Sequence, residues 1–111
     1  MAMLATPWPV EKRREPRYGV KSPVWVEAGN GRRMVATTRD ISDHGIGLWM
    51  AGSGVSGGDA VMVRFQDQQL AAKVRHAGAA GNRNESWLGL EIEHGITDHQ
   101  ARALLTLGSL A

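Results

Sequence analysis

Alternation of apolar and polar residues in short runs restricts the fold of this chain more than any other feature. In the run from residue 45 to residue 50, for example, Ile46, Leu48 and Met50 occupy every second position. A period of two residues is typical of a β-strand that buries one face. The pattern predicts six strands, at residues 20–27, 32–39, 45–50, 61–66, 70–75 and 87–92. Pro23 cannot donate a hydrogen bond to a neighbouring strand, so the first strand is predicted to be an edge strand or to be bulged.

Turn signals separate these strands, and a helix signal follows the last one. Residues 28–31 favour a hairpin turn, and a second hairpin is predicted around Asp67 and Gln68. Thr97 and Gln100 have the spacing of a capping box, which predicts a helix over about residues 97–110. Its apolar stripe is predicted to consist of Ala101, Leu104, Leu105 and Leu107.

Short antiparallel strands with regular turns favour a closed structure, because closure removes exposed strand edges. We therefore predict an all-β, β-rich fold: a six-stranded antiparallel β-barrel with a C-terminal α-helix that covers one end. The chain has 111 residues, a length that suits one domain with one modest core. Residues 1–11 show little periodicity and are expected to be a flexible segment before a domain of residues 12–111.

Composition limits where such a chain works. Cysteine is absent, which fits a reducing cytoplasm and excludes thiolate metal sites. No stretch of the sequence matches a signal peptide or a membrane-spanning helix. We therefore expect a cytoplasmic protein that does not insert into membranes.

Two polar stretches have the chemistry of a nucleotide site. The first is a basic cluster before the first strand, whose cations are Lys12, Arg13, Arg14 and Arg17. Pro16 argues against a helix there, so a turn is expected to bring Arg13 and Arg17 together. The second is a turn between two strands with the pattern D-x-S-x-x-G, formed by Asp40, Ser42 and Gly45. An arginine fork matches phosphate and the O6/N7 edge of guanine, and a carboxylate accepts from guanine N1–H and N2–H2.

Each stretch also has a simpler explanation when it is considered alone. A run of basic residues is often a solvated tail, and Asp and Ser often stabilise turns by binding backbone N–H groups. Gly45 is expected to be needed for backbone conformation in either case. Trp49, His76 and Trp87 are possible stacking residues, since a purine stacks well on an aromatic ring, but tryptophans more often pack in a core.

Several patterns that resemble catalytic or metal sites lack the required context. Residues 54–58 fit G-x-S-x-G, but the surrounding pattern is strand to strand rather than strand to helix. Ser42, Asp43 and His44 are neighbours on a turn and would point in different directions, whereas a catalytic triad must converge. The histidines show no H-x-x-x-H spacing. We therefore expect no catalytic residue, no metal ligand and no enzymatic activity.

Together, the two motifs resemble those of the PilZ domain family, the bacterial receptor module for cyclic di-GMP. The resemblance runs from about Arg13 to Ile92, and the run 87–92 looks like the family's final strand. In that family the R-x-x-x-R arginines, here Arg13 and Arg17, grip guanine and phosphates, and the D/N-x-S-x-x-G residues face the other side of the nucleotide. The resemblance implies that cyclic di-GMP is bound by Lys12, Arg13, Arg14, Arg17, Asp40, Ser42 and Gly45. It does not decide which aromatic residue stacks on guanine.

The resemblance also implies a stoichiometry and a class of partner. A cation just before R-x-x-x-R, here Lys12, is thought in the family to favour two nucleotides, which implies an intercalated cyclic di-GMP dimer. The expected function is signal transmission to an unidentified protein effector, with no cofactor besides the ligand. Two alternatives remain: a PilZ-like protein-interaction barrel that binds no nucleotide, and a small nucleic-acid-binding barrel. Net charge is only +2, and the basic residues are concentrated in one loop rather than spread along a groove. No DNA or RNA partner is therefore expected.

Overall fold

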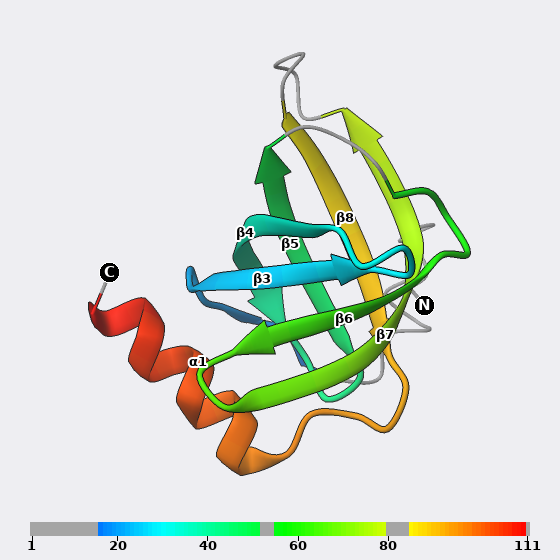
Figure 1. Ribbon diagram of the computed structural model, residues 1–111. Coiled ribbons are helices and arrows are strands. Elements are labelled where there is room, and N and C mark those ends of the chain that lie inside the picture. Colours follow the sequence, from blue (N-terminus) through cyan, green and yellow to red (C-terminus); the bar gives the residue numbers. More distant parts are fainter. Residues whose placement is uncertain (1–15, 52–54, 80–84, 111) are drawn as a thin grey trace, which may run out of the picture.

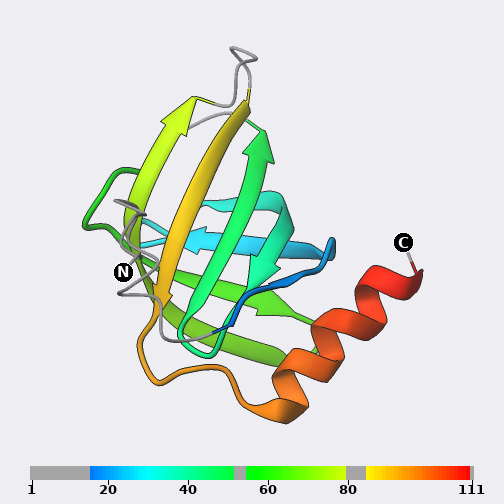
Figure 2. The same ribbon diagram turned by 180° about the vertical axis from the view of Figure 1, so that it is seen from behind.

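The computed structural model describes residues 16–51, 55–79 and 85–110 of the chain. The strands wrap around a common interior, and one helix lies at one end of them (Figures 1 and 2). The elements in chain order are β2 (Tyr18–Gly19), β3 (Pro23–Ala28), β4 (Arg33–Ile41), β5 (Gly45–Ala51), β6 (Ala60–Phe65), β7 (Gln68–Ala79), β8 (Glu85–Ile92) and α1 (Asp98–Leu110).

Antiparallel pairing joins the strands in the order β2-β4-β3-β6-β7-β8-β5, and an additional pairing of β4 with β5 closes the ring. The six long strands therefore form a closed barrel, and the two-residue strand β2 pairs with the last two residues of β4, beyond those that pair with β3. This confirms the predicted six-stranded antiparallel β-barrel with a C-terminal helix. Closure matters physically because it gives most of the backbone N–H and C=O groups a partner strand on each side.

The core consists of the inward-facing side chains of the alternating strands. Ile46, Leu48 and Met50 of β5 are buried, as their spacing predicts. Ile46 lies opposite Leu90 of β8, and Leu48 lies opposite Leu88. Burying one such side chain contributes roughly 1.5–3 kcal/mol, so these alternating positions supply most of the stability of the barrel.

Two predictions about strands and turns are wrong in detail. β3 is not an edge strand, since it pairs with both β4 and β6. Pro23 is tolerated because it is the first residue of β3, where it lies opposite Thr37 of β4, and the pairing with β6 begins only at Trp25. The second hairpin turns at Gln66 and Asp67, one residue earlier than predicted, since Phe65 pairs with Gln68.

A capping box starts α1, as predicted. The Thr97 N–H donates to Gln100 Oε1 at 2.9 Å, and the Gln100 N–H donates to Thr97 Oγ1 at 3.1 Å. The apolar stripe differs from the prediction at one position: Leu104 is fully buried against the barrel, whereas Leu105 is 46% exposed. The face of α1 that packs against the barrel therefore includes Ala103 in place of Leu105.

Buried hydrogen bonds fasten the helix to the strands. Thr38 Oγ1 accepts from the Ser22 N–H at 2.8 Å and donates to the Val20 carbonyl at 2.5 Å. Ser22 Oγ in turn donates to the Leu104 carbonyl of α1. Gly108 of α1 lies so close to the chain before β3 that a Cβ there would be 2.8 Å from the Lys21 carbonyl oxygen. These contacts fix the chain from Val20 onward against both β4 and α1.

Leu104 and Leu105 provide a matched test of this packing, because both are leucines of α1 with the same helix propensity. We expect Leu104→Ala to lower the free energy of unfolding by about 2–5 kcal/mol and Leu105→Ala to change it by at most about 0.5 kcal/mol. Urea denaturation measures both values. Equal losses for the two variants would contradict the docking of α1 described here.

Candidate functional site

The D-x-S-x-x-G turn connects β4 to β5 at the rim of the barrel. The Ser42 N–H donates to the Gly45 carbonyl at 2.9 Å, which closes the turn, and both residues are buried. Gly45 does not have a positive φ, so the predicted conformational reason for a glycine there is wrong. The reason is space: a Cβ on Gly45 would lie 3.0 Å from Arg17 Nη2 and 3.1 Å from Ser42 Oγ.

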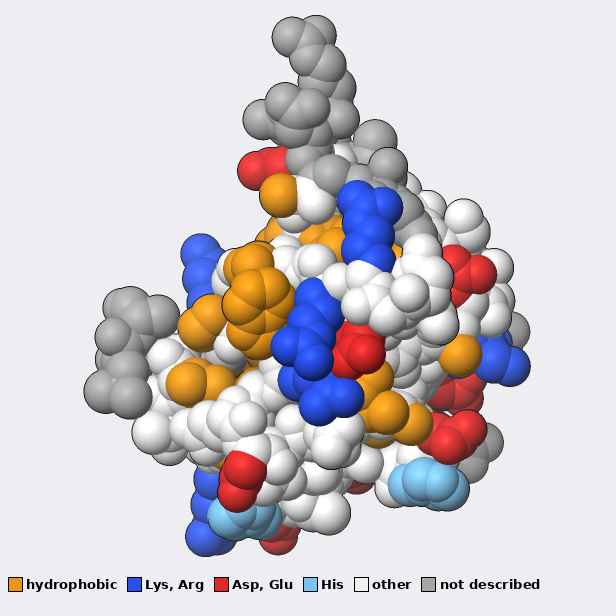
Figure 3. Space-filling model, viewed as in Figure 1, with side chains coloured by type: hydrophobic (Ala, Val, Ile, Leu, Met, Phe, Trp, Pro, Cys, Tyr) orange, Lys and Arg blue, Asp and Glu red, His pale blue; other side chains and the backbone are white. Residues whose placement is uncertain are grey.

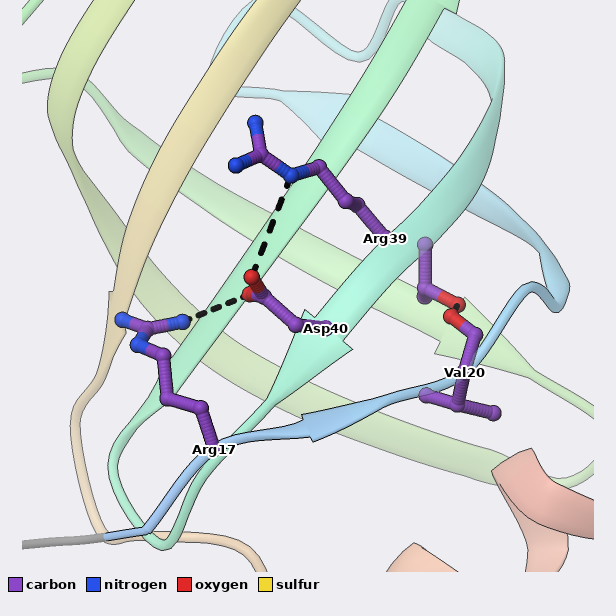
Figure 4. Close-up of polar contacts among 5 residues, drawn as sticks. Arg17, Val20, Arg39 and Asp40 are labelled. Carbon is purple, nitrogen blue, oxygen red and sulfur yellow. Dashed lines mark hydrogen bonds and ion pairs between the residues drawn. The ribbon is translucent and has the colours of Figure 1, made fainter.

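Arg17 and Asp40, which belong to different motifs, meet beside this turn. The short strand β2 pairs with β4, with Gly19 opposite Asp40, and this pairing carries Arg17 to the carboxylate. Arg17 Nη1 is 2.6 Å from Asp40 Oδ1, and Arg39 Nε is 3.9 Å from Asp40 Oδ2 (Figure 4). The two motifs thus meet through Arg17 and Asp40, a direct contact that the sequence does not predict. Lys12, Arg13 and Arg14 lie outside the described residues.

The Arg17–Asp40 pair is a weak structural contact. The Arg17 side chain is 29% exposed and the Asp40 side chain 23% exposed, so solvent screens their attraction. Ion pairs with this degree of solvent access typically contribute about 1 kcal/mol or less to stability. A ligand with its own donors and acceptors can therefore replace this contact at low cost.

A β-bulge turns Asp40 toward the outside of the barrel. Thr38 pairs with Leu48 and Asp40 pairs with Gly47, which leaves Arg39 as an extra residue on β4. Regular alternation would point Asp40 inward, because Thr38 is buried. The bulge shifts the phase by one residue, so Arg39 and Asp40 both reach solvent and Ile41 becomes buried.

A second bulge, on β7, positions His76 in the same way. The register shifts between Val74, which pairs with Leu90, and His76, which pairs with Gly89. Gly89 also pairs with Gly47, which pairs with Asp40. A row across four strands thus has Asp40 at one end, two glycines in the middle and His76 at the other end.

Because glycine has no side chain, the middle of this row has more open space above the backbone than its two ends. A Cβ on Gly47 would lie 2.7 Å from Asp40 Oδ1, and a Cβ on Gly89 would lie 3.5 Å from His76 Cδ2. Asp40 and His76 therefore lean over the glycines from opposite sides. We call this row of Asp40, Gly47, Gly89 and His76 the glycine floor.

Of the three aromatic candidates, His76 belongs to the glycine floor, and Trp49 and Trp87 lie beside it. Trp49 of β5 pairs with Trp87 of β8, one pleat away from the glycines. The rings of His76 and Trp87 have centroids 6.4 Å apart, and the Arg39 guanidinium lies 5.6 Å from the centroid of the Trp49 ring. The structure thus places all three aromatic candidates on the same outer surface as Asp40.

Three residues of this surface were not found from the sequence. Gly47 and Gly89 had a usable signal, since a glycine inside a strand often marks a close approach of other groups. Arg39 had no comparable signal, because its position beside Asp40 and over Trp49 results from the bulge.

Comparison with known proteins decides the family. The PilZ domain profile matches residues 11–107, which is most of the chain. The chain belongs to the PilZ domain family. No curated protein matches the chain significantly.

Two solved PilZ structures share this fold at low sequence identity. The PilZ domain of YcgR from Escherichia coli, solved with cyclic di-GMP, has a TM-score of 0.61 and 14% identity, and the match covers 89% of this chain and 91% of that one. The inhibitor of motility MotI/DgrA from Bacillus subtilis also has a TM-score of 0.61, with 17% identity over 86% of this chain. This PilZ chain matches only 49% of the MotI/DgrA chain, about half its length.

The described residues hold neither a metal-ligand cluster nor a membrane-spanning helix. Within residues 16–51, 55–79 and 85–110, no group of three or more His, Asp or Glu side chains is arranged to hold a metal ion. The only helix of that part of the chain, α1, is too short to cross a membrane. The surface around Asp40 is therefore the strongest candidate site of this PilZ domain among the residues described.

Proposed function

We propose that this PilZ domain is a noncatalytic, cytoplasmic receptor that binds cyclic di-GMP and transmits its presence to a protein effector. The observation that carries the proposal is the convergence of Arg17 and Asp40 beside the glycine floor. The structure of YcgR with cyclic di-GMP supports the same ligand for this chain, because the two share the fold and the family.

In the proposed complex, each residue of the site binds the part of the nucleotide that suits its chemistry. Asp40 accepts hydrogen bonds from guanine N1–H and N2–H2, which requires Arg17 to release it. Arg17 and Arg13 then bind the O6/N7 edge and the phosphates, for which an arginine fork is suited. Arg39 stays beside Asp40 and offsets its charge, so the carboxylate does not repel the phosphates.

The glycine floor provides room for a planar base. A side chain at Gly47 or Gly89 would occupy the space between Asp40 and His76, where we place guanine. His76 and Trp87 form a tilted pair at one end of this space, and Trp49 lies beside it. Base stacking on such rings contributes roughly 1–3 kcal/mol per base. Ser42 and Gly45 hold the turn that sets the position of Asp40.

Removal of either motif arginine tests the proposal. We expect Arg13→Ala and Arg17→Ala each to weaken cyclic di-GMP binding by about ten- to a hundredfold, since a hydrogen bond to a charged group contributes roughly 1.5–3 kcal/mol. Thermal stability should stay nearly unchanged, because the Arg17 ion pair is partly solvated. Isothermal titration calorimetry measures the affinities, and Arg102→Ala on the exposed side of α1 is the matched control.

Titrations of the parent chain with GMP and with single-stranded DNA distinguish the receptor function from the two alternatives. If the parent chain binds neither cyclic di-GMP nor GMP, a protein-interaction barrel without nucleotide is the better description. Binding to single-stranded DNA that weakens steeply with salt would instead favour a nucleic-acid-binding barrel. Parent-like affinity in both arginine variants would show that the ligand site has been misplaced.

A single methyl group on the glycine floor gives a second test. We expect Gly47→Ala to displace the Asp40 carboxylate and to weaken cyclic di-GMP binding at least tenfold, because the new Cβ would lie 2.7 Å from Oδ1. The free energy of unfolding should change by less than about 1 kcal/mol, since Ala suits a strand better than Gly. Gly29→Ala is the control, as a Cβ at Gly29 meets nothing within 4 Å. Unchanged affinity in Gly47→Ala would place the base elsewhere.

We also propose that two nucleotides bind per chain, as an intercalated cyclic di-GMP dimer. Lys12 and Arg14 flank Arg13 in the sequence, and this excess of cations favours a ligand that concentrates four phosphates. Lysine neutralises a phosphate but does not clamp a guanine edge. We therefore expect calorimetry to give two nucleotides per parent chain and one per Lys12→Leu chain. A parent endpoint of one nucleotide, at concentrations that populate the free dimer, would contradict the dimer while leaving the receptor function intact.

A further inference from the structure

A surface of mixed polar and apolar side chains lies on the outer side of β3 and β6. It is separate from the glycine floor. Cross-strand pairing arranges its side chains in two neighbouring rows that also include the start of β4 and of β7. The rows are Val35–Trp25–Arg64–Gln69 and Arg33–Glu27–Met62–Ala71. We call these two rows the β3–β6 face.

Large apolar side chains are exposed on this face. Trp25 is 49% exposed and Val35, which pairs with it, is 56% exposed. Apolar side chains gather over β3 and basic side chains lie beside them (Figure 3). Exposed apolar surface next to charge is typical of an interaction site, whereas isolated exposed apolar residues are not informative.

A pocket of about 470 Å³ opens beside the exposed tryptophan. Its lining consists of Trp25, Arg33 and Arg64 and of the hairpin residues 65–69, among which Asp67 is acidic. Gln66, in the turn of that hairpin, has a φ of 53°, a left-handed conformation that is uncommon for residues other than glycine. The hairpin itself accounts for this conformation, because two-residue hairpin loops use turns whose first central residue has a positive φ.

One carboxylate orients two arginines along the pocket. Arg64 Nε is 2.7 Å from Glu27 Oε1, and Arg33 Nε is 3.8 Å from the same oxygen. Within the described part of the chain, Glu27 is the ion-pair partner of both arginines, so one negative charge serves two positive charges. Each guanidinium has N–H donors besides Nε, and Arg33, which is 61% exposed and 3.8 Å from the Glu27 oxygen, can offer them to a carboxylate from outside.

The residue types of the face match those of protein interfaces. Trp, Met and Arg are enriched at interfaces, and Trp and Arg supply many of the side chains that dominate binding energy. The two rows contain Trp25, Met62, Arg33 and Arg64 and no lysine. Lysine, by contrast, is depleted at interfaces.

We propose that the β3–β6 face docks an acidic segment of a partner protein. An apolar side chain of that segment enters the pocket beside Trp25, and a neighbouring carboxylate pairs with Arg33 and Arg64. A second copy of this chain is a poorer occupant, because a symmetric contact of this face would bring arginine against arginine. The proposal does not depend on nucleotide binding, since the two surfaces have no residue in common: on β4 and β7, which both include, the glycine floor uses Asp40 and His76, outside the two rows of the β3–β6 face.

Titration of the ¹⁵N-labelled full chain with short synthetic peptides tests the proposal by NMR. The first peptide carries leucines among aspartates and glutamates, the second has lysines in place of the acids, and the third has serines in place of the leucines. We expect the first peptide to shift the resonances of Trp25, Arg33 and Arg64. Its affinity should exceed that of each control peptide at least tenfold.

Variants of the face sharpen the result. Trp25→Ala and Arg33→Gln should each weaken binding of the acidic peptide at least fivefold, while cyclic di-GMP binding stays at the parent value. Arg33 is 61% exposed, so its replacement should leave the fold intact. Equal binding of the lysine peptide, shifts outside the face, or no shifts at millimolar acidic peptide would overturn the proposal. A dimer in sedimentation that Trp25→Ala abolishes would also overturn it, because the occupant would then be a second copy.

Discussion

The pairing of β4 with β5 is the interaction on which the rest of the structure depends. It closes the ring of strands, so the core is enclosed and neither β4 nor β5 presents a long free edge. The same pairing contains the bulge at Arg39 that turns Asp40 outward over Gly47. Closure of the barrel and construction of the site are therefore properties of one strand pair. A change that restored regular pairing there would point the Asp40 carboxylate into the apolar interior, where an unpaired charge is very costly.

Bulges explain why a small barrel can carry a site on its outer wall. Strands in a closed barrel must bend, and an extra residue increases the local bend and twist. In this domain the extra residues are Arg39 on β4 and Arg75 on β7, and each bulge is followed by a side chain that leans over a glycine. The curvature that closes the barrel thus also brings Asp40 and His76 toward each other across the glycine floor.

The sequence predicts those features that depend on local chemistry. Alternation locates the six strands, and the Thr97–Gln100 spacing locates the start of α1. The two motifs single out Arg17 and Asp40, although not the direct contact between them. Features that depend on how one element is aligned with its neighbours are not predicted. The bulges have no glycine or proline to mark them, and Leu105 has the same local pattern as Leu104 although only one faces the barrel. Pro23 was misjudged because its effect depends on where the neighbouring strand begins to pair.

In the receptor function proposed above, the path of a signal is restricted by where the chain is firmly held. The buried hydrogen bonds of Thr38 and Ser22 fix the chain from Val20 onward to β4 and α1. Before that point, β2 has only two residues, both exposed, and Arg17 is held mainly by a partly solvated ion pair. A ligand shifts a conformational equilibrium only by its difference in affinity for the two states, so the cheapest change open to it is at Arg17. We therefore expect the closed barrel to stay rigid and the signal to leave through the segment before Val20. The β3–β6 face, built on paired strands, should then serve as a constant docking surface rather than as the part that changes.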